Sequence, residues 1–262
     1  MKTHAYKTAI VRQPGVNFSE GITNAKLGRP DFDKALEQHT NYVNALKDCG
    51  LEVTCLPADP RYPDGCFVED CAVVLPTVAI ITNPGHCARK GETKNIANVI
   101  QRALGIVRVN DPGTVDGGDV LRIENHYVIG LSERTNEEGA HQLGSILKDH
   151  GKTYSVITAR DLHLKTGVAY LGENCLICTA EYDADPAFQK ATEPLIERKV
   201  VVPEEERYAA NCLRINGTVL VAAGFETTKR ALEDQDFNVV TLDMSEFQKM
   251  DGGLTCLSIL CS

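Results

Sequence analysis

The chain has 262 residues, enough for one large domain or two small ones, and 43% of them are hydrophobic, enough for a sizeable core. A net charge of −9 argues against nucleic acid or an anionic membrane as partner and is compatible with a small cationic substrate. No run approaches the roughly 18 apolar residues of a transmembrane helix, and the opening MKTHAYKTAIVRQPG is too polar for a signal peptide. We therefore expect a cytoplasmic protein whose ten cysteines are free thiols.

Runs rich in Val, Ile, Thr and Tyr alternate with amphipathic helical segments along the chain. The pattern predicts strands at 6–14, 51–57, 105–110, 153–158 and 252–260, hairpins at 67–85, 117–132, 166–181 and 209–225, and helices at 31–50, 92–104 and 136–151. The order strand, strand, helix, strand recurs, which is typical of a repeat architecture.

The chemistry-bearing residues share the phase of this repeat. Their spacing is 44 to 49 positions, in the series Asp70, Asp119, His163, Asn211 and Cys256. A fixed period of this size predicts five ββαβ modules around an axis, that is, a five-module α/β propeller. No linker interrupts the repeat, so we expect residues 1–262 to form a single domain. The last strand should close the ring beside the first, with Cys256 at its inner end.

The pair Cys175 and Cys178, in "CLIC", has the spacing of a metal or redox motif. The segment around it reads as a strand, in which positions three apart face opposite sides of the sheet. One ion cannot be held from both sides, and no second such pair exists. We therefore expect two structural cysteines and no metal site.

At the centre of the predicted ring, several carboxylates meet a histidine and a cysteine. They come from the segments "YPDGCFVED", "TVDGGDV", "DLHLKTG" and "GGLTC". A cysteine with a positioned histidine is a nucleophile paired with an acid/base group. Carboxylates raise the pKa of a thiol, which makes chemical sense if the substrate itself brings the positive charge. A guanidinium pairs with two carboxylates and favours the thiolate beneath it.

Each of these segments taken alone has an ordinary structural explanation. A lone cysteine in a strand is more often part of the core, "VED" is commonly a solvated strand edge, and "DGG" is commonly a turn. Arg89 precedes a predicted helix, where solvated basic residues are common, and Arg134 lies beside a helix N-cap. The hypothesis depends on their common phase in the repeat.

The segments "PDGCFVED", "RKGET", "GTVDGGDV", "SERTNEEGA", "LHLKTG", "YAANC" and "KMDGGLTC" resemble the dimethylarginine dimethylaminohydrolases of the guanidine-modifying (pentein) superfamily. The resemblance runs along essentially the whole chain, in order, and "EGITNAKLGRPD" resembles the mobile lid loop of the family. It implies the five-module propeller, and hydrolysis of Nω-methylated arginines to citrulline and a methylamine without a cofactor.

The resemblance also implies roles for individual residues. Cys256 would be the nucleophile that forms a thiouronium intermediate, His163 the acid and later the base, and Asp116 the group that orients His163. Some members carry Glu where this chain has the shorter Asp116. The implied substrate-binding residues are Asp64, Glu69 and Asp70 for the guanidinium, Arg89 and Arg134 for the α-carboxylate, and the carbonyls of Ile22 and Met250 for the α-ammonium.

Four alternatives remain at this stage. An arginine deiminase or an amidinotransferase would use the same site, although both usually have longer chains. A non-catalytic methylarginine-binding protein is a third. The fourth, a metal enzyme, arises because Cys256, His163 and the carboxylates are zinc ligands, which we interpret as an inhibitory zinc site at Cys256. Either a monomer or a homodimer is compatible with the sequence.

Overall fold

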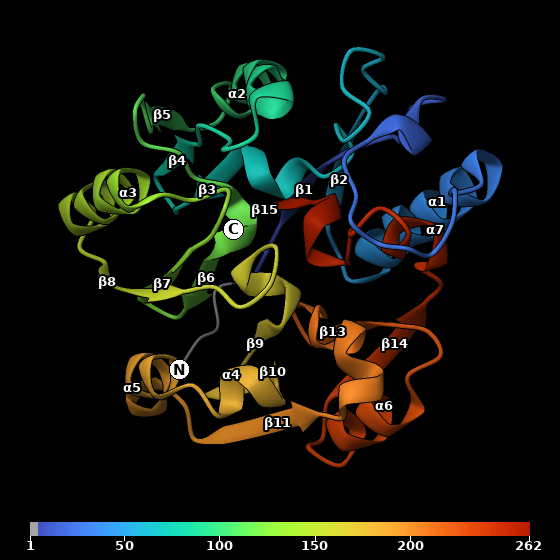
Figure 1. The fold of residues 1–262 in the computed structure, drawn as a ribbon, viewed down its shortest axis with the longest axis vertical. Coiled ribbons are helices and arrows are strands. Elements are labelled where there is room, and N and C mark those ends of the chain that lie inside the picture. Colours follow the sequence, from blue (N-terminus) through green and yellow to red (C-terminus); the bar gives the residue numbers. More distant parts are fainter. Residues whose placement is uncertain (1–4) are drawn as a thin grey trace.

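Five three-stranded sheets follow one another around an axis in the computed structural model, which describes residues 5–262 (Figure 1). In chain order the strands are β1 (Thr8–Arg12), β2 (Glu52–Leu56), β3 (Ala72–Val74), β4 (Val78–Ile81), β5 (Gly105–Arg108), β6 (Val120–Ile123), β7 (His126–Leu131), β8 (Thr153–Thr158), β9 (Val168–Gly172), β10 (Cys175–Thr179), β11 (Arg198–Val202), β12 (Leu213–Ile215), β13 (Thr218–Ala222), β14 (Asn238–Leu242) and β15 (Ile259–Cys261).

Each sheet combines one antiparallel and one parallel strand pair. In the second module β3 pairs with β4 antiparallel, and β4 pairs with β5 parallel after a helical crossover. The helices are α1 (Phe32–Asp48), α2 (Thr93–Ile100), α3 (Glu137–Asp149), α4 (Ala180–Asp183), α5 (Pro186–Thr192), α6 (Glu226–Glu233) and α7 (Ser245–Gln248). The predicted ββαβ module is thus confirmed, since a parallel pair needs such a crossover.

The last strand closes the ring. β15 pairs antiparallel with β1, with Thr8 opposite Cys261 and Ile10 opposite Ile259. The N-terminal and C-terminal strands therefore share one sheet, β15-β1-β2. This confirms the five-module propeller and the predicted place of the last strand.

Local sequence sets where the crossover helices begin. Asp31 caps α1 by accepting a hydrogen bond from Lys34 N at 2.9 Å, and Asn136 caps α3 by accepting one from Gly139 N at 2.8 Å. Along α1, Tyr42 and Leu46 are fully buried against the first sheet. His39, on the same helix, is also buried.

The first strand of every module faces the axis. Residues of β3, β6, β9, β12 and β15 together line an axial channel, among them Val74, Arg122, Tyr170, Arg214 and Leu260. Apolar clusters fill the space between neighbouring sheets. Cys175 and Cys178 belong to two different clusters, which confirms that they face opposite sides of β10.

The inner ends of four modules are 3-10 turns, three of which lie where the sequence pattern predicts strand. They are η2 (Val68–Cys71), η4 (Gly117–Asp119), η5 (Leu164–Thr166) and η8 (Thr255–Leu257). Cys256 therefore lies in η8, three residues before the first residue of β15, and not at the start of the strand. The turn is closed by the Cys256 amide, which donates to the Gly253 carbonyl at 3.2 Å.

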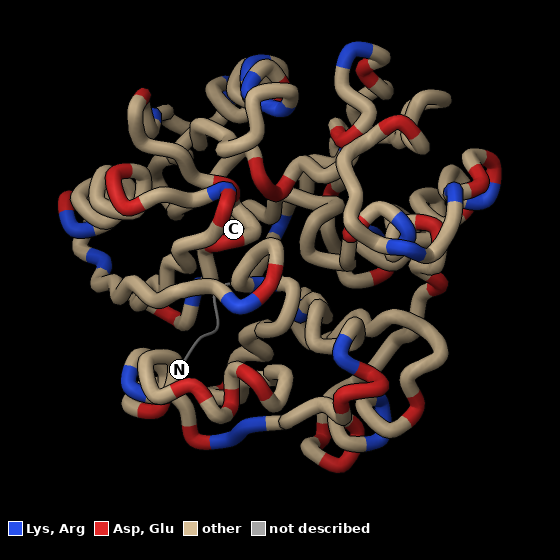
Figure 2. Tube along the Cα trace, viewed as in Figure 1, with Lys and Arg blue, Asp and Glu red and all other residues tan. Residues whose placement is uncertain are grey.

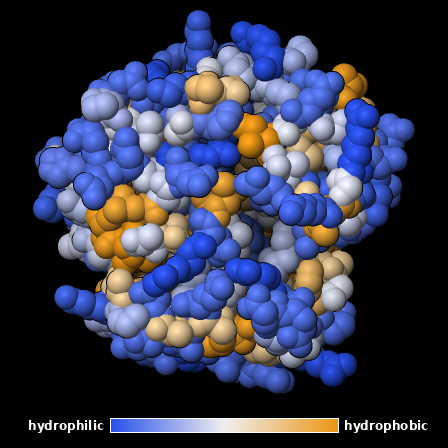
Figure 3. Space-filling model, viewed as in Figure 1, coloured by the Kyte–Doolittle hydropathy of each residue, from blue (hydrophilic) through white to orange (hydrophobic). Residues whose placement is uncertain are grey.

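The described residues contain four further 3-10 turns. They are η1 (Phe18–Glu20), η3 (Cys87–Glu92), η6 (Glu193–Leu195) and η7 (Glu204–Ala210). Between residues 5 and 262 no helix has both the length and the apolar character needed to cross a bilayer. The face in Figure 3 is mostly hydrophilic, with apolar side chains in separate patches.

Candidate active site

The 3-10 turns bring the acidic segments to the axis. η2 contacts η4 and η8, and η4 contacts η5, so four modules meet at one point. In Figure 2 the acidic residues of η2 and of the segment entering β6 lie next to the centre of the ring. Segments that occupy the same position in the sequence repeat therefore lie close together in space.

A small pocket lies at this meeting point. Its lining comprises Ile22, Asp64, Phe67, Asp70, Arg89, Arg134, Leu162, His163, Met250, Asp251, Gly252 and Cys256. Eight of the ten residues expected at the site are in that set. The other two, Glu69 and Asp116, lie beside it and differ in what they do.

Cys256 is the thiol of the pocket. Its Sγ accepts a hydrogen bond from the Gly253 amide at 3.3 Å. Burial raises its pKa to about 12, helped by the charges of Glu69 and Asp70 and opposed by Lys165. The thiol is therefore neutral near pH 7 until a cation enters the pocket.

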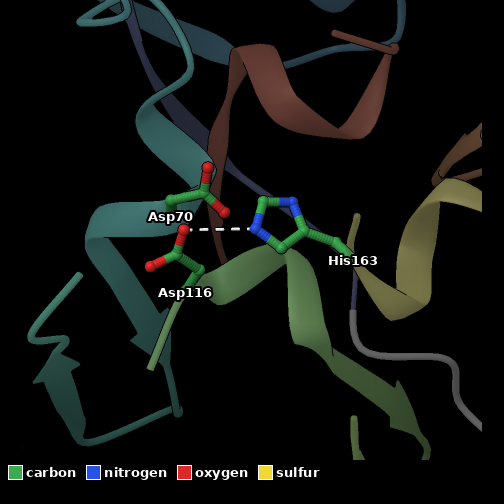
Figure 4. Close-up of side chains that lie close together, drawn as sticks. All are labelled: Asp70, Asp116 and His163. Carbon is green, nitrogen blue, oxygen red and sulfur yellow. Dashed lines mark hydrogen bonds and ion pairs between the residues drawn. The ribbon is translucent and has the colours of Figure 1, made fainter. Parts of the chain in front are cut away.

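His163 faces two carboxylates (Figure 4). Its Nε2 hydrogen-bonds Asp116 Oδ2 at 3.1 Å, and Asp70 lies on the same side of the ring. Burial alone would lower the pKa of His163, but Asp70 and the hydrogen bond with Asp116 outweigh it and raise the pKa to about 9. A protonated imidazole is the acid that an amine leaving group needs. The short Asp116 side chain does reach His163.

Asp116 and Asp119 fix the position of His163, Asp116 through the imidazole ring and Asp119 through the backbone of the next residue. Both carboxylates are fully buried. Asp116 Oδ1 accepts a hydrogen bond from the Gly85 amide at 2.9 Å, and Asp119 Oδ1 accepts one from the Leu164 amide at 2.9 Å. Burial raises the pKa of Asp119 to about 6.

The glycines of "VDGGDV" permit this packing. A Cβ on Gly118 would lie 2.7 Å from His163 Nδ1 and 3.0 Å from Asp70 Oδ1. The Gly118 amide also donates to Asp70 Oδ1 at 2.8 Å. The glycine is therefore required by close approach, whereas the sequence suggests only a turn.

Arg89 is buried and heavily bonded. Its Nη1 donates to Asp70 Oδ2 at 2.6 Å, while its Nε and Nη2 donate to Glu92. Nη2 also donates to the Phe67 carbonyl at 3.0 Å. Burial acts to raise the pKa of Asp70, but His163 and Arg89 outweigh it and lower the pKa to about 2. Asp70 is thus a permanent negative charge in the pocket.

Arg134 and Asp64 are less committed to internal partners. Arg134 is 9% exposed, and its Nη1 approaches Asp116 Oδ2 only to 3.8 Å. Asp64 accepts hydrogen bonds from the Ile22 amide at 3.1 Å on both oxygens, and burial raises its pKa. Both groups therefore retain capacity for a ligand in the pocket.

Glu69 lies outside the pocket lining, in contrast to the sequence expectation of direct contact with a guanidinium. Its Oε1 accepts from Lys165 Nζ at 2.5 Å and its Oε2 accepts from Thr255 Oγ1 at 2.8 Å. Glu69, Lys165 and Thr255 line the axial channel instead. In a 3-10 turn neighbours point about 120° apart, which sends Glu69 and Asp70 to different sides.

Three potential metal-ligand atoms cluster here. One atom each from Asp70, Asp116 and His163 lie within 4.8 Å of one another. Cys256, the expected zinc ligand, is not a member of this cluster, although it lines the same pocket as Asp70 and His163. Carboxylate and imidazole are acceptable zinc ligands, but using them would compete with the His163–Asp116 hydrogen bond.

Several contributing residues escape sequence reasoning. Lys165 follows His163 by two positions, Glu92 follows Arg89 by three, and Asp251 follows Met250. Their only sequence signal is proximity to a candidate residue. Their partners, Glu69, Arg89 and the segment 21–31, lie elsewhere in the chain or across a turn, so spacing does not reveal the pairs.

Comparison with known proteins agrees with this geometry. A family model described as eukaryotic N,N dimethylarginine dimethylhydrolase matches residues 31–259. The chain is 42% identical to the N(G),N(G)-dimethylarginine dimethylaminohydrolase of Pseudomonas aeruginosa over 97% of this chain and 99% of that protein. It is 36% identical to the Streptomyces coelicolor protein of the same name, over 97% and 96%.

Solved structures show the same relationship. A cysteine-to-serine mutant of the P. aeruginosa enzyme in complex with citrulline superposes with a TM-score of 0.93 at 41% identity, covering 98% of this chain and 99% of that one. The substrate-bound N-terminal domain of a cyanobacterial arginine dihydrolase shares the fold, with a TM-score of 0.87 at 18% identity and coverage of 97% and 98%.

The closed five-module ring with a cysteine, a histidine and carboxylates at its centre defines a propeller of the guanidine-modifying superfamily. Within that class, the family model and the two bacterial relatives point the same way. The chain belongs to the dimethylarginine dimethylaminohydrolase family.

Proposed function

We propose that this enzyme hydrolyses Nω-methylated L-arginines to L-citrulline and dimethylamine or methylamine. The observation that carries the proposal is one pocket in which the Cys256 thiol and the protonated His163 face two carboxylates, Asp64 and Asp70. A thiol in that setting needs a cationic substrate to become a thiolate, and a guanidinium is a cation whose carbon is the electrophile. The 42% identity to a named dimethylaminohydrolase supports the same assignment.

Binding is proposed to divide among the pocket residues. Asp70, the permanently charged carboxylate, and Asp64 hold the guanidinium. Arg134, which has only a distant internal partner, holds the α-carboxylate together with the remaining Nη1 hydrogen of Arg89. The carbonyls of Ile22 and Met250, at the rim of the pocket, accept from the α-ammonium.

Glu69 joins this network indirectly. With both carboxylate oxygens bonded to Lys165 and Thr255, it contributes negative charge beside Cys256. Direct contact with the guanidinium would require Lys165 to release it. This distinguishes its role from that of Asp70.

The first half-reaction forms a covalent intermediate. Substrate binding favours loss of the Cys256 proton to solvent, and the thiolate attacks the guanidinium carbon. The carbon–nitrogen bond to the methylated amine breaks as His163 gives its proton to that amine. An S-alkylthiouronium remains on Cys256.

The second half-reaction uses the neutral His163 left behind. His163 takes a proton from water, whose oxygen attacks the thiouronium carbon, and the carbon–sulfur bond breaks to release citrulline and the thiolate. Asp116 keeps the imidazole in position and stabilises its protonated form through both halves.

No step in this scheme uses a cofactor. We further propose that zinc, if bound at Cys256 with His163, inhibits by occupying the thiolate and the acid. Activity that rises when EDTA is added to zinc-treated enzyme would support this. Activity abolished by EDTA would instead require a metal in catalysis.

Residues 1–262 are proposed to work as one catalytic domain, in the cytoplasm, as a monomer or a homodimer. The ten free cysteines fit a reducing compartment. Light scattering coupled to size-exclusion chromatography decides between the two assembly states.

Citrulline formation tests the function directly. The purified enzyme is incubated separately with asymmetric dimethylarginine, monomethylarginine and arginine, with and without EDTA. We expect both methylated substrates to turn over well above arginine. Turnover of arginine alone would make the enzyme a deiminase, and no citrulline from any of them would contradict the proposal.

A further inference from the structure

The pocket is narrow in this structure. Its free volume is about 30 Å³, room for no more than a few water molecules. No amino acid can enter unless part of the wall moves. One lining segment, residues 21–31, hereafter the lid, has no helix or strand over its whole length and is exposed at most of its positions. In Figure 1 the lid is part of the blue chain between η1 and α1.

Two carboxylates tie the lid to the rest of the ring. Asp64 accepts from the Ile22 amide inside the pocket. At the rim, Asp251 Oδ2 accepts from the Asn24 amide at 2.6 Å, from Thr23 Oγ1 at 3.1 Å and from the Ala25 amide at 3.3 Å. One carboxylate oxygen thus collects three donors from consecutive lid residues.

Asp251 is held in a conformation that suits this contact. Its φ is +57°, in the left-handed region that Asp and Asn tolerate better than most residues. It sits between Met250 and Gly252, both of which line the pocket. The turn is packed from below, because a Cβ on Gly252 would lie 2.2 Å from Phe67 Cε1. The acceptor is therefore fixed while its donors are on the lid.

The outer half of the lid has few ties of its own. Arg29 Nε donates to Ser19 at 3.0 Å, and the Asp31 amide donates to Glu246 at 2.8 Å. Leu27 is 55% exposed, and Gly28 adopts φ +88°. The side chains of residues 26–28 make no hydrogen bond to the rest of the described chain.

We propose that Asp251 is a positioning residue that latches the lid over the pocket and so places Ile22 against the substrate. Loss of this carboxylate frees the amides of Asn24 and Ala25, while Thr23 keeps its bond to the Lys249 carbonyl and Ile22 keeps its bonds to Asp64. The placement of Ile22 rests on the proposed function, whereas the latch itself does not.

The variant Asp251→Gly isolates the carboxylate. Glycine accepts positive φ without strain, so the turn keeps its shape while the latch is lost. The matched control is Asp236→Gly, because Asp236 also has positive φ, at +64°, and its side chain makes no hydrogen bond in the described part of the chain. Asp251→Asn is the conservative variant, equal in size and tolerant of the same φ, but neutral.

Limited trypsin digestion reads the latch without any substrate. Lys26 is an exposed cleavage site within the lid, whereas the bond after Arg29 is protected because Pro30 follows it, and the other lysines and arginines serve as an internal check on global unfolding. We expect cleavage in the lid to be about tenfold faster in Asp251→Gly than in the wild type or in Asp236→Gly. This corresponds to a tenfold change in the equilibrium constant for lid opening. Asp251→Asn should give an intermediate rate. Equal lid cleavage in Asp251→Gly and Asp236→Gly would overturn the latch.

Steady-state kinetics then tests the positioning of Ile22. We expect Asp251→Gly to raise KM for dimethylarginine several-fold more than it lowers kcat, and Asp251→Asn to restore part of the KM. Faster lid cleavage with unchanged KM would overturn the positioning role. If the wild type forms no citrulline the proposed function fails, and the trypsin result still decides whether Asp251 is a latch.

Discussion

Glu69 and Asp70 are adjacent in the chain but line two different cavities. Asp70 lines the pocket with His163 and Arg89, whereas Glu69 lines the axial channel with Lys165. Both are buried next to the thiol, and both raise its pKa. Two neighbouring carboxylates can therefore lower the acidity of one thiol while only one of them faces the pocket.

The two sides also differ in how the charge is balanced. On the channel side, Lys165 neutralises Glu69 at 2.5 Å. On the pocket side, Asp70 has Arg89 and His163, and Asp64 has no ion-pair partner within the described chain. The uncompensated charge is therefore in the pocket, where a cationic substrate would supply the balance.

The largest predicted effect comes from removing the proposed nucleophile, Cys256. Cys256→Ser should lower citrulline formation by at least about 10⁴-fold, because an alcohol lacks the accessible anionic form of a thiol. Binding of citrulline by calorimetry should persist, since the carboxylates and arginines remain. A variant that keeps even one-tenth of wild-type activity would rule out covalent catalysis at Cys256.

Neutralising each member of the pair sharpens the comparison. Asp70→Asn should reduce kcat/KM about 10³-fold, because it removes the charge facing the guanidinium and the acid. Glu69→Gln should cost about tenfold or less, because its contacts are to Lys165 and Thr255. Measured kcat/KM for dimethylarginine checks both. A greater loss of kcat/KM in Glu69→Gln would mean that Glu69 contacts the substrate directly.

The charge state of His163 can be read from stability against pH. Its pKa is raised from 6.5 to about 9 in the folded protein, so its contribution to stability is fully present below pH 6.5 and is lost as pH rises through 9. The loss is up to about 3 kcal/mol. Urea unfolding of the wild type and of His163→Gln at pH 6 and pH 9 gives the difference. Parallel pH dependence in the two proteins would mean that His163 is neutral when folded.

Loss of the channel-side cation should have a smaller effect. Lys165→Met leaves Glu69 buried with Thr255 as its remaining partner and should lower the free energy of unfolding by about 1–3 kcal/mol. KM for dimethylarginine should change less than it does in Asp70→Asn, because Lys165 does not line the pocket. A KM change as large as that of Asp70→Asn would place Lys165 on the substrate.

Much of the fold and the site follows from the period of the sequence. The 44- to 49-residue spacing brings Asp70, His163 and Cys256 together, because each ends one module at the axis. What period does not specify is direction. The alternation of side chains along a strand does not apply in the 3-10 turns. The sequence pattern therefore does not predict that Glu69 points into the axial channel, or that Cys256 lies in a turn.

The partners that complete the site come from contacts distant in sequence. Lys165 meets Glu69 across 96 positions and Asp251 meets Asn24 across 227. Each looks like a solvated residue in its own segment. Gly118 is a related case, since its role follows from the side chains of His163 and Asp70 and not from its backbone angles.

Alkylation of Cys256 tests the central claim, that a neutral thiol in an acidic pocket is activated by the charge of its ligand. The wild type is treated at pH 7 with a small cationic haloamidine or with the neutral haloacetamide of similar size, and modification of the peptide containing Cys256 is followed by mass spectrometry. We expect the cationic reagent to react at least about 100-fold faster, because a positive charge close to a thiolate lowers the pKa of the thiol. Equal rates for the two reagents would contradict it.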